Sequence, residues 1–301
     1  MIKGIIAPNL TFFTTDGKVD ENKCIWHMHW MLEKGVNGLF VTGTYGSGSL
    51  MTLEERIKLF KTARTISEQH PSSFVIAHVG CPDTESSVLL TKAAQEAGVD
   101  AVSAIVPYNY KYTDDEILRF YSQVVKSASI PVYAYNNPDL TNIPISFKLV
   151  KRLEESGVAG LKDSAINMQL VSSILNSNAI NGRRFHYISG TTTGWLAFQK
   201  IGIDTMIAGM CNYVPEIVEA LYRYSFTDPH KASRVYEIVN ELGSSIKVGN
   251  SVASSHISLK ARGFDPDFAR LPLTVSYDDK KEKISQIANL IDEAIRKTDS
   301  L

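Results

Sequence analysis

Four short segments of this sequence repeat one pattern, in which a helical stretch ends at a glycine and an apolar run follows. Glycine suits the position after a helix because it readily adopts the left-handed conformation that satisfies the last helical carbonyls. The apolar run that follows is typical of a strand buried on both faces. The four segments are Gly35-Val36-Asn37-Gly38-Leu39-Phe40-Val41, Gly98-Val99-Asp100-Ala101-Val102-Ser103-Ala104, Gly157-Val158-Ala159-Gly160-Leu161-Lys162 and Gly202-Ile203-Asp204-Thr205-Met206-Ile207-Ala208. They predict helix-to-strand joints spread along most of the chain.

When the segments between these joints are assigned in the same way, the sequence predicts eight strands that alternate with helices over residues 1–225. Two of the helices are expected to begin with capping boxes, at Thr52-Leu53-Glu54-Glu55 and Thr113-Asp114-Asp115-Glu116. The glycines of residues 43–48 do not spell a nucleotide-binding loop, so a (β/α)8 TIM barrel is favoured over an open doubly wound sheet. The expected strands lie near Ile2 to Ala7, Leu39 to Gly43, Phe74 to Val79, Ala101 to Val106, Val132 to Asn136, Ala159 to Asp163, His186 to Gly190 and Thr205 to Gly209.

The remainder of the chain, residues 226–301, has only helical patterns. Its last helix is expected to carry an apolar stripe that includes Ile284, Ile287, Ile291 and Ile295. We therefore divide the chain into a catalytic barrel over residues 1–225 and C-terminal helices over residues 226–301 that pack on the barrel.

Composition excludes several classes of function. The chain has 31 basic and 32 acidic side chains, so it lacks the positive charge that nucleic-acid binding requires. It shows neither a signal peptide nor an apolar run of about 18 residues, which leads us to expect a cytoplasmic protein without a membrane segment. Three widely spaced cysteines predict buried free thiols, and no grouping of histidines and acids predicts a metal site.

Lys162 is the clearest candidate for a catalytic residue. Its apolar neighbours predict a buried strand, where desolvation would lower the pKa of the amine and make it a nucleophile. A neutral lysine can form a Schiff base with a carbonyl substrate and so allow carbon–carbon cleavage without a cofactor. The alternative is a structural salt bridge, for instance with Asp163.

Tyr135 and Thr44 also fall at the carboxyl ends of strands, where the active sites of such barrels lie. Tyr135 ends the strand before that of Lys162, and neighbouring strands run about 4.8 Å apart, so its phenol is expected near the amine. Thr44 could relay a proton to Tyr135, and the amides of Thr44 and Tyr45 could bind a carboxylate. The alternatives are a tyrosine that anchors the rim and an ordinary tight turn.

The order of these motifs resembles the dihydrodipicolinate synthase and N-acetylneuraminate lyase family. The resemblance rests on Gly43-Thr44-Tyr45-Gly46, Tyr135-Asn136-Asn137-Pro138 and Gly160-Leu161-Lys162-Asp163-Ser164, and extends to Ala7-Pro8, Pro107-Tyr108, Ser189-Gly190 and the run from Gly209 to Pro215. It implies a class I aldolase barrel and a homotetramer, with Lys162 forming a Schiff base with pyruvate, Tyr135 transferring protons, and Thr44 with Tyr45 holding the carboxylate. No cofactor is expected. Further substrate contacts are expected from residues at the same strand ends, namely Gly43, Pro8, Tyr108, Gly190, Thr191 and Ile207.

Departures from the family pattern indicate the substrate. Leu140 stands where the synthases carry an arginine for a second carboxylate, and the segment Thr191-Thr192-Thr193 replaces the acidic residues of the sialic acid lyases. Asn109 replaces a tyrosine of the synthases, and Tyr45 and Ser47 replace a small hydroxyl residue and a glutamate. This neutral, hydroxyl-rich lining favours reversible cleavage of a 2-keto-3-deoxy sugar acid, such as 2-keto-3-deoxygluconate, to pyruvate and an aldehyde. The alternatives are N-acetylneuraminate lyase or dihydrodipicolinate synthase activity, a dehydratase, a hydratase-aldolase with an aromatic aldehyde, and a barrel that binds a keto acid without catalysis.

Overall fold

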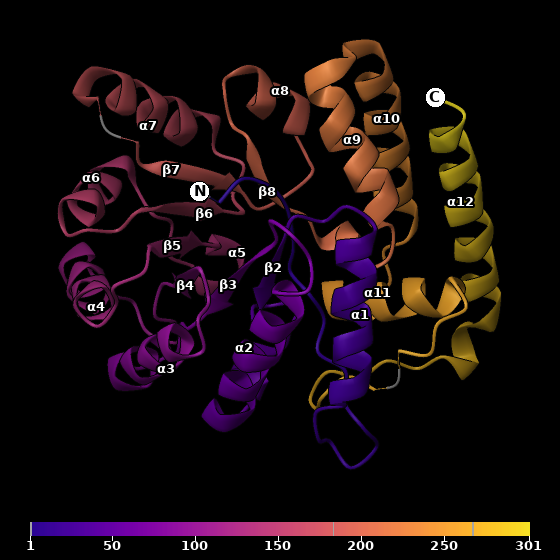
Figure 1. Ribbon diagram of the computed structural model, residues 1–301, viewed down its shortest axis with the longest axis horizontal. Coiled ribbons are helices and arrows are strands. Elements are labelled where there is room, and N and C mark those ends of the chain that lie inside the picture. Colours follow the sequence, from indigo (N-terminus) through magenta and orange to yellow (C-terminus); the bar gives the residue numbers. More distant parts are fainter. Residues whose placement is uncertain (1, 183, 267) are drawn as a thin grey trace.

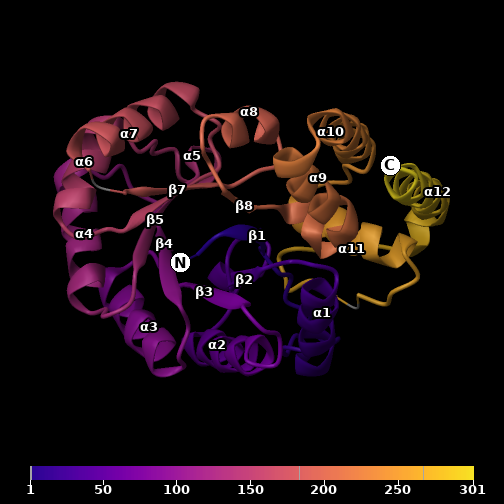
Figure 2. The same cartoon turned by 45° about the horizontal axis from the view of Figure 1, so that its top comes forward.

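The expected alternation of strands and helices closes into a barrel in the computed structural model, which describes residues 2–182, 184–266 and 268–301. Eight parallel strands follow one another around the ring, and the first pairs with the last. The predicted (β/α)8 barrel with a C-terminal helical extension is therefore confirmed (Figures 1 and 2). The strands are β1 (Gly4–Ala7), β2 (Gly38–Val41), β3 (Phe74–His78), β4 (Ala101–Ile105), β5 (Val132–Asn136), β6 (Gly160–Asp163), β7 (His186–Ser189) and β8 (Thr205–Ile207).

Helices surround the ring of strands, and further helices follow β8. Both predicted capping boxes are present, at Thr52 with Glu55 and at Thr113 with Glu116. The helices are α1 (Glu21–Glu33), α2 (Leu53–Ser67), α3 (Thr84–Glu96), α4 (Asp114–Lys126), α5 (Pro138–Thr141), α6 (Phe147–Glu155), α7 (Met168–Asn181), α8 (Trp195–Lys200), α9 (Pro215–Thr227), α10 (Pro229–Ser245), α11 (Ser251–Ala261) and α12 (Lys281–Asp299).

The four glycine joints have the conformation that the sequence predicts. Gly35, Gly98, Gly157 and Gly202 all have φ between +80° and +97°. At each joint the amide of the next residue donates a hydrogen bond to the carbonyl five residues before it, as Val36 does to Met31 at 3.2 Å. This arrangement ends the helix and turns the chain directly into the following strand.

The barrel interior is filled by apolar and aromatic side chains, so the barrel is a packed core with its working face at one end. Phe40, Ile105, Tyr135, Ile188 and Ile207 all belong to this interior cluster. The second and larger core lies between the strands and the surrounding helices.

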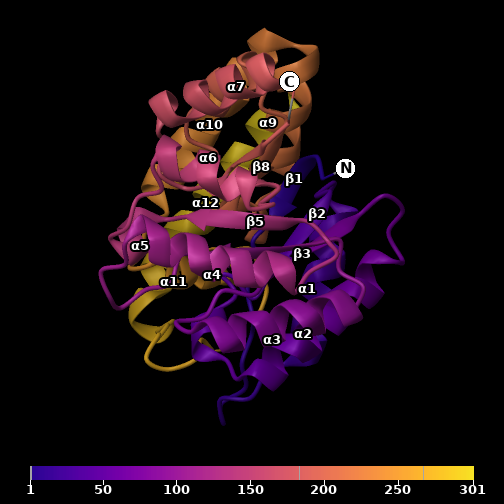
Figure 3. The ribbon, with the colours of Figure 1, turned by 90° about the vertical axis from the view of Figure 1, so that its left-hand side faces the viewer.

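The C-terminal helices do more than cover the flank of the barrel. In Figure 1, α10 and α12 lie side by side next to the barrel, and Figure 3 shows α11 with α5 on the side opposite the N-terminus. Arg262, at the end of α11, donates to the carbonyl of Tyr213 and to the carboxylate of Glu216, both at 2.8 Å. This anchor holds α11 across the end of the barrel where the strands finish.

Candidate active site

Lys162 and Tyr135 occupy facing positions on neighbouring strands. Their Cα atoms are register partners between β5 and β6. The Lys162 side chain extends over the phenol ring, with Nζ 3.3 Å from the ring centre, and it also lies 5.2 Å from the centre of the Phe40 ring. Lys162 is 5% exposed and Tyr135 is 3% exposed, so the amine is held in an aromatic, largely dehydrated environment.

Burial lowers the pKa of the Lys162 amine, although Tyr135 and Asp163 act in the opposite direction. The Asp163 carboxylate is used elsewhere: it accepts hydrogen bonds from Asn136 at 2.8 Å, from the Ala165 amide at 2.9 Å and from the Tyr187 hydroxyl at 3.0 Å. Among the described residues Lys162 forms no ion pair. The alternative in which Lys162 serves only as a salt-bridge partner of Asp163 therefore finds no support in the geometry.

The Tyr135 hydroxyl lies within a small polar network. It accepts a hydrogen bond from the Asn137 side-chain amide at 3.0 Å and lies 3.4 Å from the Thr44 hydroxyl. Burial alone would raise the pKa of Tyr135, but the charge of Lys162 and these polar neighbours outweigh it and lower the pKa to about 8. Such a phenol can accept and return protons near neutral pH.

The loop after β2 presents backbone amides beside this pair. The turn is tight, because a Cβ on Gly48 would stand 1.8 Å from the Thr42 carbonyl oxygen, and Thr42 itself has φ of 55°. Within the described chain, the amides of Thr44 and Tyr45 donate to no protein acceptor. Two free amides on one loop can together bind a carboxylate.

Tyr45 turns its phenol toward the end of β8. A Cβ on Gly209 would stand 2.1 Å from the Tyr45 hydroxyl oxygen, so only glycine leaves room for the ring in this position. Burial raises the pKa of Tyr45, which keeps this phenol neutral and able to donate a hydrogen bond.

These side chains surround a cavity of about 360 Å³, which we call the lysine chamber. Eight of the ten site residues expected from the sequence line it, including Thr44 and Lys162 themselves. The other six are Pro8, Tyr45, Tyr135, Gly190, Thr191 and Ile207. Gly43 and Tyr108 do not line it.

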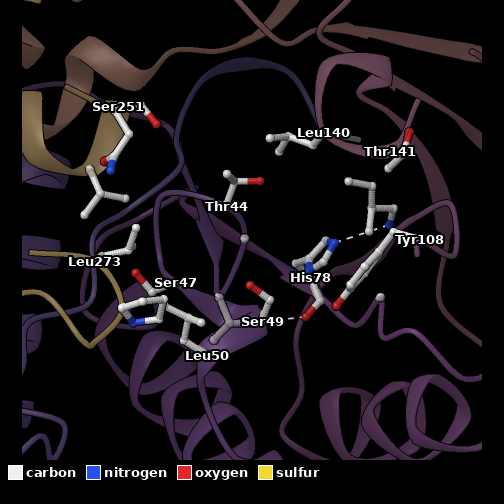
Figure 4. A pocket seen from close by; sticks show the side chains of 17 residues that line it. Thr44, Ser47, Ser49, Leu50, His78, Tyr108, Leu140, Thr141, Ser251 and Leu273 are labelled. Atoms are coloured by element: carbon white, nitrogen blue, oxygen red, sulfur yellow. Dashed lines mark hydrogen bonds between the residues drawn. The ribbon is translucent and has the colours of Figure 1, made fainter. Parts of the chain in front are cut away.

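Gly43 and Tyr108 instead line a neighbouring cavity of about 390 Å³, which we call the apolar chamber (Figure 4). Leu50, Leu140 and Leu273 project into it, and Thr44 lies between it and the lysine chamber. The other lining residues are Thr42, Ser47, Ser49, His78, Gly80, Ile105, Thr141, Asn250, Ser251, Val252 and Pro272.

His78 lies in the wall of the apolar chamber, and its contacts agree with a neutral ring. Its Nε2 accepts from the Ile105 amide at 3.3 Å (Figure 4). Its Nδ1 lies 3.4 Å from the Arg56 guanidinium. Burial and the charges of Arg56 and Lys162 lower the pKa of His78 well below its usual range. The ring also meets that of Tyr135 edge to face, with centres 5.9 Å apart.

Sequence reasoning missed several residues that line the site, among them Asn137 and Ser251. Asn137 stands inside the quoted Tyr-Asn-Asn-Pro motif, and its spacing of two from Tyr135 was the available indication. Ser251 begins α11 and lines both chambers, although it lies about 90 residues beyond Lys162 in the chain. No local pattern around Ser251 pointed to this contact.

Among the described residues, no three potential metal ligands are grouped together. No helix in the same part of the chain has both the length and the apolar character needed to cross a bilayer. The three cysteines are free and buried, as expected.

A barrel with a buried lysine that extends over a tyrosine ring, beside a loop with two free backbone amides, has the architecture of a class I aldolase. Comparison with known proteins agrees with this class. The model of the dihydrodipicolinate synthetase family matches residues 1–291, so the chain belongs to that family. It is accordingly a lyase.

Individual relatives are distant but cover the chain well. An uncharacterised DapA-like lyase of Thermococcus onnurineus is 28% identical over 95% of this chain and 98% of its own. The probable 2-dehydro-3-deoxy-D-pentonate aldolase YjhH of Escherichia coli is 31% identical over 73% of each chain. The structure of a Sulfolobus solfataricus 2-keto-3-deoxygluconate aldolase variant superposes with a TM-score of 0.88 at 22% identity, over 99% of both chains, which supports the fold.

Proposed function

We propose that this lyase cleaves a 2-keto-3-deoxy sugar acid, such as 2-keto-3-deoxygluconate, to pyruvate and an aldehyde. The observation that carries the proposal is the buried Lys162 amine, 3.3 Å from the centre of the Tyr135 ring and beside the free amides of Thr44 and Tyr45. This arrangement offers a nucleophile, a proton carrier and a carboxylate site around one cavity.

The proposed reaction begins when Lys162 attacks the C2 carbonyl and water leaves, which gives a protonated imine. The Tyr135 phenolate, with Thr44 as relay, then removes the proton of the C4 hydroxyl. The C3–C4 bond breaks and the aldehyde departs. The electron pair of that bond forms the C2–C3 double bond of an enamine whose nitrogen is Nζ of Lys162. Protonation of C3 and hydrolysis of the imine release pyruvate and restore the free amine.

The lining of the lysine chamber supports a polyhydroxy substrate. Ser164, Thr191 and Thr192 supply hydroxyls, and Asn137 supplies an amide. Among the described residues that line the chamber, Asp139 is the only acidic one. Leu140 lines this chamber as well and offers no guanidinium for a second carboxylate, which argues against dihydrodipicolinate synthase activity. The names of the Escherichia coli and Sulfolobus relatives point to the same substrate class.

Pyruvate release from a panel of keto acids tests the proposal. The wild-type protein should release pyruvate from a 2-keto-3-deoxy sugar acid, and the Lys162→Met variant should release none. A dehydrated keto acid formed without pyruvate would instead identify a dehydratase, and no turnover of any keto acid would favour the non-catalytic barrel.

A second candidate function follows from the apolar chamber. Leu50, Leu140, Val252 and Leu273 give it a hydrocarbon surface that suits an aromatic or alkyl aldehyde better than a polyol. A hydratase-aldolase would place such a group there. Condensation of pyruvate with benzaldehyde faster than with glyceraldehyde would select this candidate.

The assembly and the location of the protein remain predictions. We propose a homotetramer on the family resemblance, and light scattering of the purified protein tests it. The expected cytoplasmic location is tested by fractionation of cells that express the protein.

A further inference from the structure

A third cavity continues outward from the lysine chamber. It has a volume of about 600 Å³, and we call it the outer chamber. Four residues line both chambers and so form the passage between them: Tyr45, Thr192, Met210 and Ser251. A keto acid bound at Lys162 and too long for the lysine chamber would therefore extend past Tyr45 into this space.

The wall of the outer chamber is polar and almost uncharged. Thr193, Asn240, Ser244, Ser254 and further hydroxyl residues supply neutral hydrogen-bonding groups. Lys247 is the one Lys, Arg, Asp or Glu among its lining residues. The lining residues of the outer chamber thus carry a net positive charge.

Lys247 has no competing partner in the described part of the chain. It appears in no hydrogen bond, ion pair or ring contact there. The nearby carbonyl end of α10, which would attract a cation, is already used: Lys283 donates to the Ser245 carbonyl at 3.2 Å. The Lys247 ammonium is therefore available to a ligand.

We propose that the outer chamber binds the far end of the keto acid and that Lys247 pairs with an anionic group there. This inference rests on the proposed function and narrows it: the substrate is a 2-keto-3-deoxy acid whose end remote from the keto group carries a second anion. A phosphate monoester or a carboxylate supplies this chemistry.

The first test compares three keto acids in the pyruvate-release assay: 2-keto-3-deoxygluconate, its 6-phosphate, and the corresponding diacid with a terminal carboxylate. The wild-type protein should show a higher kcat/KM with one or both anionic substrates. Because Lys247 is exposed, Lys247→Ala should lower that kcat/KM by about fivefold, through KM and with kcat unchanged. The kcat/KM for 2-keto-3-deoxygluconate, whose tail is uncharged, should not change in this variant.

Two control variants isolate the role of this side chain. Lys92→Ala removes the same charge from the exposed surface of α3 and should leave every kcat/KM unchanged. Lys247→Arg keeps the charge and should retain the preference for the anionic substrates. The anionic substrate whose kcat/KM falls most in Lys247→Ala shows whether the site prefers a phosphate or a carboxylate. The inference would be overturned if the variant changed kcat/KM equally for charged and uncharged substrates, or changed it for none.

A binding measurement separates failure of this inference from failure of the proposed function. The same keto acids are added as competitors while pyruvate is trapped on Lys162 with borohydride. Stronger competition by the anionic compounds in the wild-type protein, weakened in Lys247→Ala, supports the inference even if none is cleaved. Equal competition by charged and uncharged compounds refutes it, whatever the result of the cleavage assay.

Discussion

Replacement of Tyr135 by phenylalanine removes one oxygen from the centre of the proposed proton path. That oxygen accepts from Asn137 at 3.0 Å and lies 3.4 Å from the Thr44 hydroxyl, while the ring beneath Lys162 Nζ stays in place. Loss of a positioned acid–base group typically costs about 10²- to 10⁴-fold in rate, or about 3 to 5 kcal/mol of transition-state stabilisation. We expect kcat for cleavage of the keto acid to fall within that range.

Two assays on Tyr135→Phe separate catalysis from folding. Pyruvate release gives kcat, and borohydride trapping with pyruvate reports whether Lys162 still forms an imine. Because the variant leaves the Asn137 amide short of one acceptor, its free energy of unfolding should fall by about 1 to 3 kcal/mol, which urea titration measures. A Thr44→Ser variant, which keeps the hydroxyl, serves as control and should retain most activity. A decrease in kcat of less than tenfold in Tyr135→Phe would refute the assigned role of the phenol.

Three further predictions follow from the geometry. The rate of cleavage should rise with pH toward about 8 and then level off, because Tyr135 becomes a phenolate above its lowered pKa. The pH–rate profile of Tyr135→Phe should lack this rise. Gly209→Ala places a Cβ 2.1 Å from the Tyr45 hydroxyl oxygen and should raise KM for the keto acid at least about tenfold in steady-state kinetics. An unchanged KM would contradict the position of Tyr45 beside the substrate. Arg270→Ala removes a bidentate ion pair with Glu55, whose two contacts are 2.5 and 2.6 Å long. This variant should lower the free energy of unfolding by about 1 to 2 kcal/mol, and an unchanged urea midpoint would show that the ion pair does not contribute to stability.

The barrel was predictable because its determinants are local. A glycine after a helix and an apolar run behind it are read within about seven residues, and all four such joints have the expected positive φ. The pairing of Tyr135 with Lys162 also followed from sequence, since consecutive strands of a barrel are neighbours.

The outer walls of the site were not predictable for the opposite reason. Ser251 and Lys247 reach the cavities only because the segment after α10 folds back over the barrel end, and the contacts that fix it, such as Arg262 with Tyr213, are distant in sequence. Tyr108 was correctly expected at a strand end, but the path of the loop after β4 turns it toward the apolar chamber. Residue position in a loop does not determine side-chain direction as strand alternation does.

Mass analysis of the protein after borohydride reduction with pyruvate tests the role of Lys162 most directly. The account predicts one reduced pyruvyl adduct per chain, located on the peptide that contains Lys162 and absent from Lys162→Met. A protein that stays unmodified, or that carries the adduct on surface lysines while Lys162 remains free, would contradict it.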